Sequence, residues 1–167
     1  MNTIAIFDEK NYDLNWMRFK RRAVRGIIIV NNKIALVKSK KAGFYKFPGG
    51  GIEDKESHTE TLVREIREET GLIVIPKSIR EFGMVHEIRK SIKGIEEIFD
   101  QKSYYYFVDV EKESLAQDLD DYEIELGYVL EWADIKHAYE TNIALSMHYE
   151  GKFLLREAAV LQKLLEL

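Results

Sequence analysis

Three glutamates near the middle of the chain have types and spacing that could support chemistry. Glu65, Glu68 and Glu69 lie in the segment "VREIREETG". In a helix, which turns about 100° per residue, these side chains share one face. Carboxylates this close repel one another, so a bound cation would stabilise them. Hard divalent cations such as Mg²⁺ and Mn²⁺ prefer oxygen ligands of this kind.

A second interpretation makes this segment a solvated charged face, which is the commoner meaning of an isolated acidic run. The neighbouring residues favour chemistry instead. Arg64 lies one turn before Glu68 and can orient a carboxylate through an ion pair. The run Pro48-Gly49-Gly50-Gly51 precedes the segment, and its backbone can approach a ligand closely because the glycines have no side chains.

The helix that would carry the glutamates has clear start and stop signals. Ser57 and Glu60 have the spacing of a capping box, and Gly71 stands where a helix usually ends. The sequence therefore predicts a helix over residues 58–70.

The remaining pattern predicts an α+β fold around a mixed sheet. Asn31-Asn32 separates two apolar runs, as in a hairpin, and Asp134 could cap a helix that runs through Tyr139. The acidic segment from Asp118 to Glu125 is interpreted as a loop, and "NWMRFKRR" as a linker or an edge strand. Further strands are expected at "TIAIF", "LIVI", "IREFGMVHEIR", "YYYFVDV" and "YVLEW", and a last helix at "KFLLREAAVLQKLLEL".

Length and composition predict one globular domain over residues 1–167. Hydrophobic residues make up 46% and charged residues 32% of the chain, as in ordinary soluble proteins. The first residues resemble neither a signal peptide nor a membrane-spanning helix, so a cytoplasmic protein without membrane contact is expected. The formal net charge of −4 argues against a long nucleic acid as partner. Two basic clusters, within residues 18–25 and 38–46, are either solvated faces or sites that steer phosphate groups.

The glycine loop and the acidic helix together match a known pattern. The pattern is Gly50, five residues, Glu56, seven residues, Arg64-Glu65-Ile66, one residue, Glu68-Glu69, one residue and Gly71-Leu72. It resembles the box of the Nudix hydrolase family at every fixed position. The order of elements is compatible from about Val24 to the C-terminus, and residues 1–22 lie outside the resemblance as an N-terminal extension.

The resemblance implies an α/β/α sandwich with a mixed sheet and a metal-dependent hydrolase. The substrate would be a nucleoside diphosphate linked to another moiety, or a nucleoside triphosphate, and the cofactor would be Mg²⁺ or Mn²⁺. The implied metal ligands are the carbonyl of Gly49 and the carboxylates of Glu65, Glu68 and Glu69. Arg64 would hold the carboxylates in place, and Glu56 would stabilise the loop.

The group that takes the proton from the attacking water has two candidates. Glu65 is one, because a rigid helix holds it close to the metal. The other is an acid from the segment before the last strand, Glu125 or Glu123.

The substrate-binding side is predicted from the loop and the aromatic residues before it. The backbone at Gly50 would approach the substrate phosphates. Phe44 and Tyr45 could stack on a nucleobase, or they could be core residues of a strand.

Other functions stay open at this point. One alternative is a Nudix-fold module that binds a nucleotide without cleaving it. Degenerate box carboxylates would favour this alternative, and this box has none. Removal of an RNA cap could use the basic clusters, but the net charge is negative. The proline of ADP-ribose-specific members is missing, since Pro48 and Pro76 are the only prolines. The N-terminal strand and C-terminal helix could form a homodimer interface or pack on their own sheet.

Overall fold

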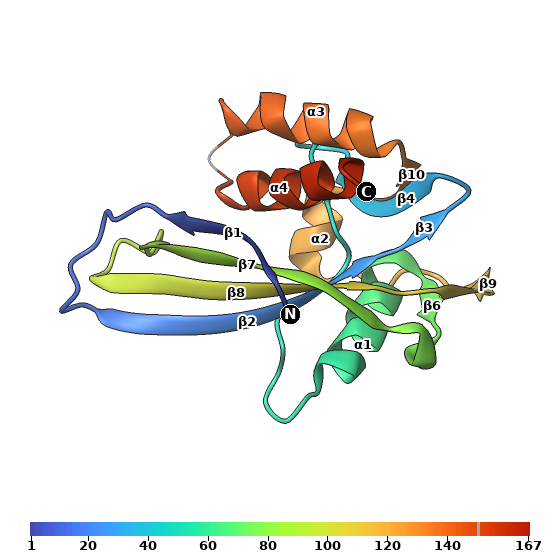
Figure 1. Cartoon of the computed structure of the whole chain (residues 1–167), viewed down its shortest axis with the longest axis horizontal. Helices are drawn as coiled ribbons and strands as arrows, with labels where there is room; N and C mark the ends of the chain where they lie inside the picture. The colour runs from blue at the N-terminus through green and yellow to red at the C-terminus, as the bar shows by residue number, and fades with distance from the viewer. Residues whose placement is uncertain (150) are drawn as a thin grey trace.

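The computed structural model describes residues 1–149 and 151–167. Helices α3 (Ile135–Ser146) and α4 (Phe153–Leu165) lie on one side of the strands, and α1 (His58–Thr70) lies on the other (Figure 1). A short helix, α2 (Asp121–Leu126), packs beside the last strand. The predicted α+β architecture, a sandwich with helices on both sides of the strands, is therefore confirmed.

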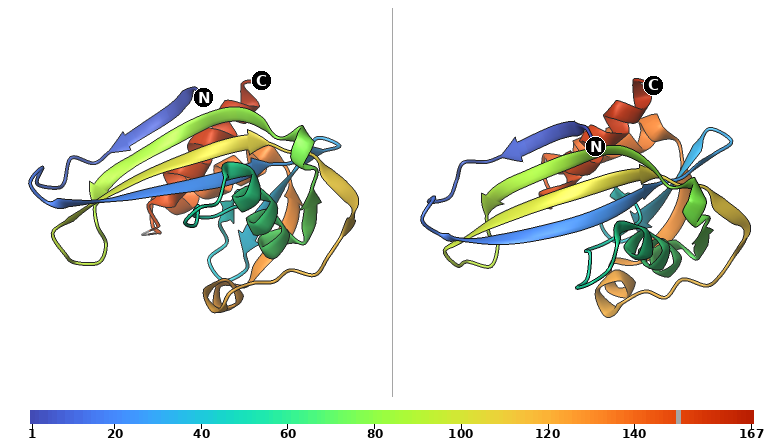
Figure 2. Two further views of the ribbon diagram at one scale, coloured as in Figure 1. Left: turned by 90° about the horizontal axis from the view of Figure 1, so that it is seen from below. Right: turned by 60° about the horizontal axis from the view of Figure 1, so that its bottom comes forward.

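The strands differ in length, from two residues in β3 to eleven in β2, β7 and β8. Their bounds are β1 Thr3–Asp8, β2 Met17–Ile27, β3 Ile29–Val30, β4 Lys33–Ser39, β5 Tyr45–Lys46, β6 Leu72–Val74, β7 Arg80–Lys90, β8 Glu97–Phe107, β9 Val110–Ser114 and β10 Tyr128–Ala133. A 3₁₀ turn, η1 (Pro76–Ser78), follows β6. The strands β2, β7 and β8 extend past the helices at one end of the molecule (Figure 2).

Parallel and antiparallel pairs are mixed, as the sequence predicted. One four-stranded sheet has the order β1-β7-β8-β2, in which β1 is parallel to β7, β7 is antiparallel to β8, and β8 is parallel to β2. A second sheet has the order β10-β4-β3, with β5 also paired to β4. The strands β6 and β9 pair with each other.

The predicted hairpin is confirmed at Asn31-Asn32, between β3 and β4. Asn31 and Asn32 have φ angles of 49° and 60°. This left-handed conformation is what a two-residue hairpin turn requires, and asparagine tolerates it better than most residues.

The helix α1 has the bounds that its capping signals predicted. The Ser57 side chain accepts a hydrogen bond from the Glu60 N–H, and the Glu60 carboxylate accepts one from the Ser57 N–H. Gly71 ends the helix with a φ of 76°. On the flank facing the strands, Leu62 and Ile66 are completely buried, which fixes the rotation of the helix about its axis.

The helix α3 is longer than predicted and runs through Ser146 rather than ending at Tyr139. Its extra turns are held by a distant contact. The buried side chain of Asn142 accepts a hydrogen bond from the Tyr45 N–H and donates one to the Tyr45 carbonyl. Such a contact between α3 and β5 is not visible in local sequence.

The segment "NWMRFKRR" contributes an edge strand, because residues from Met17 onward belong to β2 and pair with β8. Strand β1 lies at the opposite edge of the same sheet, beside β7, and packs against α4. The helices of the described residues include none that is both long and apolar enough to cross a membrane. The assignment of the whole chain to a single domain stays a prediction.

Candidate active site

The glycine loop lies alongside β2 and is held there by backbone hydrogen bonds. The Val24 N–H donates to the Gly50 carbonyl at 2.9 Å, and the Gly26 N–H donates to the Pro48 carbonyl at 2.8 Å. Gly49 has a φ of 136°, and a Cβ there would lie 2.2 Å from the Val24 carbonyl oxygen. Both the backbone conformation and the close approach therefore require glycine at position 49.

Gly50 brings the loop directly against the acidic face of α1. A Cβ at this position would lie 2.2 Å from Oε2 of Glu65. Because Gly50 has no side chain, the loop backbone and the Glu65 carboxylate can meet.

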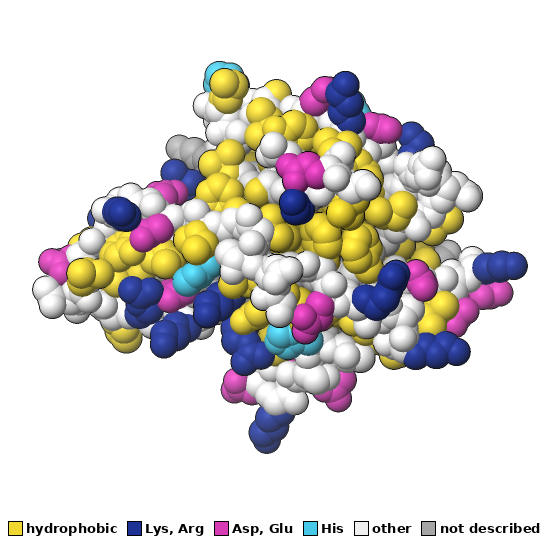
Figure 3. All heavy atoms as spheres, viewed as in Figure 1, with side chains coloured by type: hydrophobic (Ala, Val, Ile, Leu, Met, Phe, Trp, Pro, Cys, Tyr) yellow, Lys and Arg dark blue, Asp and Glu magenta, His cyan; other side chains and the backbone are white. Residues whose placement is uncertain are grey.

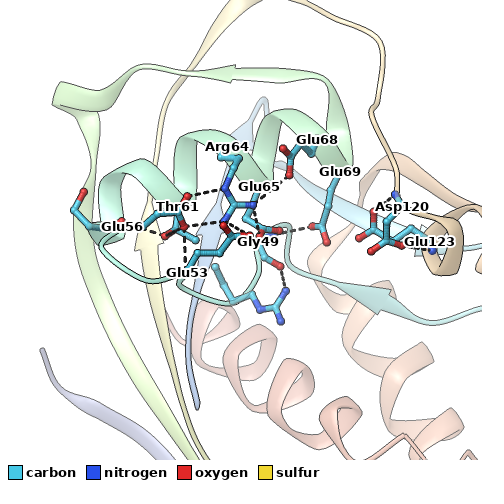
Figure 4. A network of polar contacts seen from close by, with 12 residues as sticks. Gly49, Glu53, Glu56, Thr61, Arg64, Glu65, Glu68, Glu69, Asp120 and Glu123 are labelled. Carbon is cyan, nitrogen blue, oxygen red and sulfur yellow. Dashed lines mark hydrogen bonds and ion pairs between the residues drawn. The ribbon is translucent and has the colours of Figure 1, made fainter. Parts of the chain in front are cut away.

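Arg64 connects the start of α1 to its acidic face (Figure 4). Its Nε and Nη2 donate to the two oxygens of Glu56 at 2.7 and 2.8 Å. Its Nη1 donates to Glu65 at 2.7 Å and to Glu68 at 3.3 Å. The guanidinium lowers the pKa of Glu56 to about 2, so this carboxylate is ionised at neutral pH. One side chain thus orients three carboxylates.

The three glutamates of the helix have different surroundings. Burial raises the pKa of Glu65, and the charge of Glu69 raises it further, while the hydrogen bond from Arg64 opposes this shift. The Glu68 side chain is about a third exposed. Glu69 is buried, and its two oxygens accept from the Gly49 N–H at 2.8 Å and from Lys46 Nζ at 2.5 Å.

Glu123 of α2 approaches these carboxylates from a distant part of the sequence. Figure 4 shows its side chain turned toward Glu69. Burial and the negative charge of Glu69 raise the pKa of Glu123 to about 7. The acidic segment is therefore not simply a loop, since Glu123 and Asp120 form a capping box that starts α2, and Gly127 ends it. The same signal that located α1 was present here and could have located this helix.

Glu125, predicted as a catalytic group, points away from the site. Its side chain is 72% exposed and forms an ion pair with Lys41 at 3.0 Å. Residues two apart in a helix lie about 200° apart around the axis, so Glu123 and Glu125 face opposite sides of α2. The prediction of Glu125 is wrong for this reason, and Glu123 is the acid of this segment that faces the box.

Phe44 and Tyr45, predicted to stack on a nucleobase, are both completely buried. The Phe44 ring packs edge-on against Phe153 and Tyr128, with centroid distances of 4.9 and 6.1 Å. The Tyr45 hydroxyl donates to Glu131 at 2.6 Å. Neither ring has a free face for a base, so the stacking prediction is wrong and the alternative, that they are core residues, is confirmed.

The Gly49 carbonyl, predicted as a metal ligand, accepts a hydrogen bond from Nη1 of Arg25. A carbonyl oxygen has two lone pairs, but a guanidinium and a metal ion would repel each other at this position. Arg25 would have to share or release this oxygen when a metal binds.

The donor chemistry of the site fits a hard divalent cation. In the part of the chain that the structure describes, no three acidic or histidine side chains are grouped closely enough to hold a metal as they stand. The available donors on α1 are nevertheless all carboxylate oxygens, the ligands that Mg²⁺ and Mn²⁺ prefer. Arg64 and Lys46 supply the positive charge that these acids need, and a metal could replace part of it.

Comparison with known families places this site in context. The NUDIX domain family matches residues 20–150. The chain therefore belongs to the NUDIX family, as the sequence pattern predicted. Members of this family generally need a divalent metal.

Relatives and solved structures agree with this membership. An ADP-ribose pyrophosphatase of Methanocaldococcus jannaschii is 50% identical over 60 residues, which are 34% of this chain and 36% of that protein. An 8-oxo-dGTP diphosphatase of Buchnera aphidicola is 38% identical over 74 residues, which are 42% of this chain and 55% of that protein. The matched region thus spans between about a third and about half of these relatives. A NUDIX hydrolase from Nitrosomonas europaea shares the fold, with a TM-score of 0.58 at 18% identity over 83% of this chain and 85% of that one.

Proposed function

We propose that this chain hydrolyses the diphosphate linkage of a small nucleotide, either a nucleoside diphosphate joined to another moiety or a nucleoside triphosphate, with Mg²⁺ or Mn²⁺ as cofactor. The observation that carries this proposal is the intact acidic face of Glu65, Glu68 and Glu69 beside the glycine loop of a NUDIX family member. The names of two relatives, an ADP-ribose pyrophosphatase and an 8-oxo-dGTP diphosphatase, support attack of water on a phosphoanhydride.

The residues of the site have separate tasks in this reaction. Glu65, Glu68 and Glu69 would hold the metal, which would neutralise charge that develops on the phosphoryl oxygens. Arg64 keeps two of these carboxylates directed to one side of α1. Lys46 now neutralises Glu69, and it would be free to contact a substrate phosphate once a metal takes over that carboxylate.

We assign the acceptance of the water proton to Glu123 rather than Glu65. Glu65 is proposed to hold the metal, and one of its oxygens already accepts a hydrogen bond from Arg64, so few of its lone pairs stay free to accept a proton. Glu123 forms no ion pair among the described residues, yet it is turned toward Glu69 at the edge of the acidic face (Figure 4). A base needs to reach the water without being a main ligand of the metal, and Glu123 meets this requirement.

The proposed function is tested by a panel of nucleoside triphosphates, dinucleotides and nucleotide sugars. Release of phosphate, pyrophosphate or nucleoside monophosphate would be measured with Mg²⁺, with Mn²⁺ and with excess chelator. We expect turnover of at least one compound that stops when the metal is removed. Tight nucleotide binding by calorimetry without any product would instead indicate a binding module.

A further inference from the structure

A cleft of about 360 Å³ lies next to the proposed active site. The strands β2, β7 and β8 form one wall, and residues of β5, α2, β10 and α4 form the other. Lys46 and Arg25 both line it. Because Lys46 binds Glu69 and Arg25 binds the Gly49 carbonyl, the cleft reaches the acidic face and the glycine loop.

The sheet wall of this cleft is polar where a covered sheet face is normally apolar. Arg21 of β2, Gln101 of β8 and Glu87 of β7 lie side by side in register. Gln101 and Glu87 are only 2% and 5% exposed. In the next row, Arg89 of β7 lies over the ring of Phe99, 4.2 Å from its centroid. Burial of polar groups costs free energy unless they are partnered, so the partners of each group decide which charges are compensated.

The acids of this region are already neutralised by a different arginine. Arg156 of α4 is buried and forms ion pairs with Glu87 and with Glu157, each at 2.8 Å. The Glu157 carboxylate also accepts from the Phe47 N–H and the Tyr105 hydroxyl. These two carboxylates are therefore satisfied without the arginines of the sheet.

Three arginines of the cleft have no carboxylate partner among the residues that the structure describes. Across residues 1–149 and 151–167, Arg21, Arg25 and Arg89 form no ion pair; their hydrogen bonds go to Gln101 and to backbone carbonyls. The Nε atoms of Arg25 and Arg89 are buried without any hydrogen-bond partner in the same residues, and Arg25 as a whole is 6% exposed. Burial and the charges of Arg25 and Arg156 lower the pKa of Arg21, and the more weakly acting charges of Glu65 and Glu87 oppose this shift only in part.

The arginines on the opposite face of β2 provide a contrast. Figure 3 shows Lys and Arg side chains gathered along this strand on the outer surface. Arg18 forms an ion pair with Asp100 at 2.7 Å, and Arg22 contacts His58 at 3.0 Å. These two arginines of the outer face thus have side-chain partners, whereas the arginines without an ion pair among the described residues line the cleft.

We propose that the cleft binds a second anionic group of the substrate, a phosphate remote from the scissile diphosphate, through Arg21 and Arg89. This proposal rests on the proposed hydrolase function and narrows its substrate class. Guanidinium groups bind phosphate oxygens through paired, charge-assisted hydrogen bonds, and both of these arginines line the cleft. A volume of about 360 Å³ exceeds that of one phosphate and suits the moiety that carries it.

Matched substrate pairs test this proposal. Coenzyme A and dephospho-coenzyme A share their scissile diphosphate and differ by one remote phosphate, as do NADPH and NADH. We expect kcat/KM to be at least about tenfold higher for the phosphorylated member of one pair, and this ratio to fall below about threefold in Arg89→Gln and Arg21→Gln. Arg80→Gln is the control, because Arg80 is an exposed arginine at the other end of β7. A wild-type ratio below about threefold in both pairs would overturn the proposal.

Binding of inorganic tripolyphosphate to the metal-free protein separates the anion site from catalysis. By calorimetry, Arg89→Gln should raise the Kd at least about tenfold while Arg80→Gln leaves it unchanged, with circular dichroism to verify folding. If no nucleotide is hydrolysed, the tripolyphosphate measurement still tests the anion site. A loss of affinity in Arg89→Gln would then support the anion site although the hydrolase function had failed, and equal affinity in all three proteins would overturn the site as well.

Discussion

The acidic face of α1 and the arginine-lined cleft are neighbours of opposite charge, and they differ in how their charges are satisfied. On the acidic face, Arg64 is the partner of Glu65 and Glu68, and Lys46 is the partner of Glu69. In the cleft, Arg21 and Arg89 lack a carboxylate partner among the described residues.

This difference indicates what each cluster requires from a ligand. The glutamates are held in place by positive groups of the chain, so a metal ion exchanges with charges that are already present. Arg21 and Arg89 have, respectively, a hydrogen bond to Gln101 and a contact with the Phe99 ring, but no ion pair among the described residues, so an anion would add the charged partner that they lack there. A metal would thus bind to carboxylates that the chain already holds in place. A phosphate would instead supply the charged partner that the cleft arginines lack among the described residues.

The largest effect is expected at Glu123, the acid beside the α1 face that forms no ion pair in the described part of the chain. Glu123→Gln should lower the single-turnover rate by about 100-fold, because a general base contributes an effect of this order, and excess Mn²⁺ should not restore it. Glu125→Gln is the matched control on the same helix and should stay within about twofold of wild type. A mild Glu123→Gln together with an unrescued Glu65→Gln would move the base to Glu65.

The next largest effect is expected when a substitution removes a charged ligand from the acidic face. Glu69→Gln should lower turnover by roughly 10- to 100-fold and raise the Mg²⁺ concentration needed for half-maximal rate, since a neutral amide is a weaker ligand. Initial rates over a metal titration measure both quantities. Glu140→Gln, at an exposed position of α3, serves as control. An unchanged metal dependence in Glu69→Gln would contradict its role as ligand.

A third variant gives the cleft an internal carboxylate partner, which Arg21 lacks among the described residues. Gln101 accepts from Arg21 Nη1 at 2.6 Å, so Gln101→Glu would place a carboxylate beside this guanidinium. We expect the Kd for tripolyphosphate to rise about tenfold by calorimetry. Lys102→Gln changes the net charge equally on an exposed neighbouring position and should have little effect. Similar changes in both variants would show that only overall charge matters.

The smallest effect concerns the ion pair that anchors the acidic face. The pKa of Glu56 lies at about 2, below its ordinary value of 4.5, so its pair with Arg64 stabilises the fold above pH 4.5 and loses this contribution as the pH falls toward 2. Glu56→Gln should lower the free energy of unfolding by about 1 kcal/mol at pH 7, the upper end for a pair near solvent. Urea denaturation at several pH values should show this difference shrinking in acid; a constant difference would exclude the ion pair as its cause.

The sequence alone determined the features that depend on neighbouring residues. The capping box of Ser57 and Glu60, the stop at Gly71 and the turn at Asn31-Asn32 are set by local hydrogen bonds and backbone conformation, so they were predicted correctly. The common face of Glu65, Glu68 and Glu69 follows from helical geometry in the same way. The family pattern was readable for this reason, since most of it lies in one loop and one helix.

The tertiary structure decided everything that depends on which distant segments meet. Phe44 and Tyr45 have the composition of a stacking site, but α4 and α3 cover them. The acids Glu123 and Glu125 are equivalent in sequence, and only the packing of α2 beside β10 turns one toward Glu69 and the other toward solvent. Arg21 and Arg89 are far apart in the chain, and only the β2-β8-β7 order brings them to one wall of the cleft. Local signals specify backbone geometry, whereas burial and charge compensation arise from contacts across the fold, which no single stretch of sequence contains.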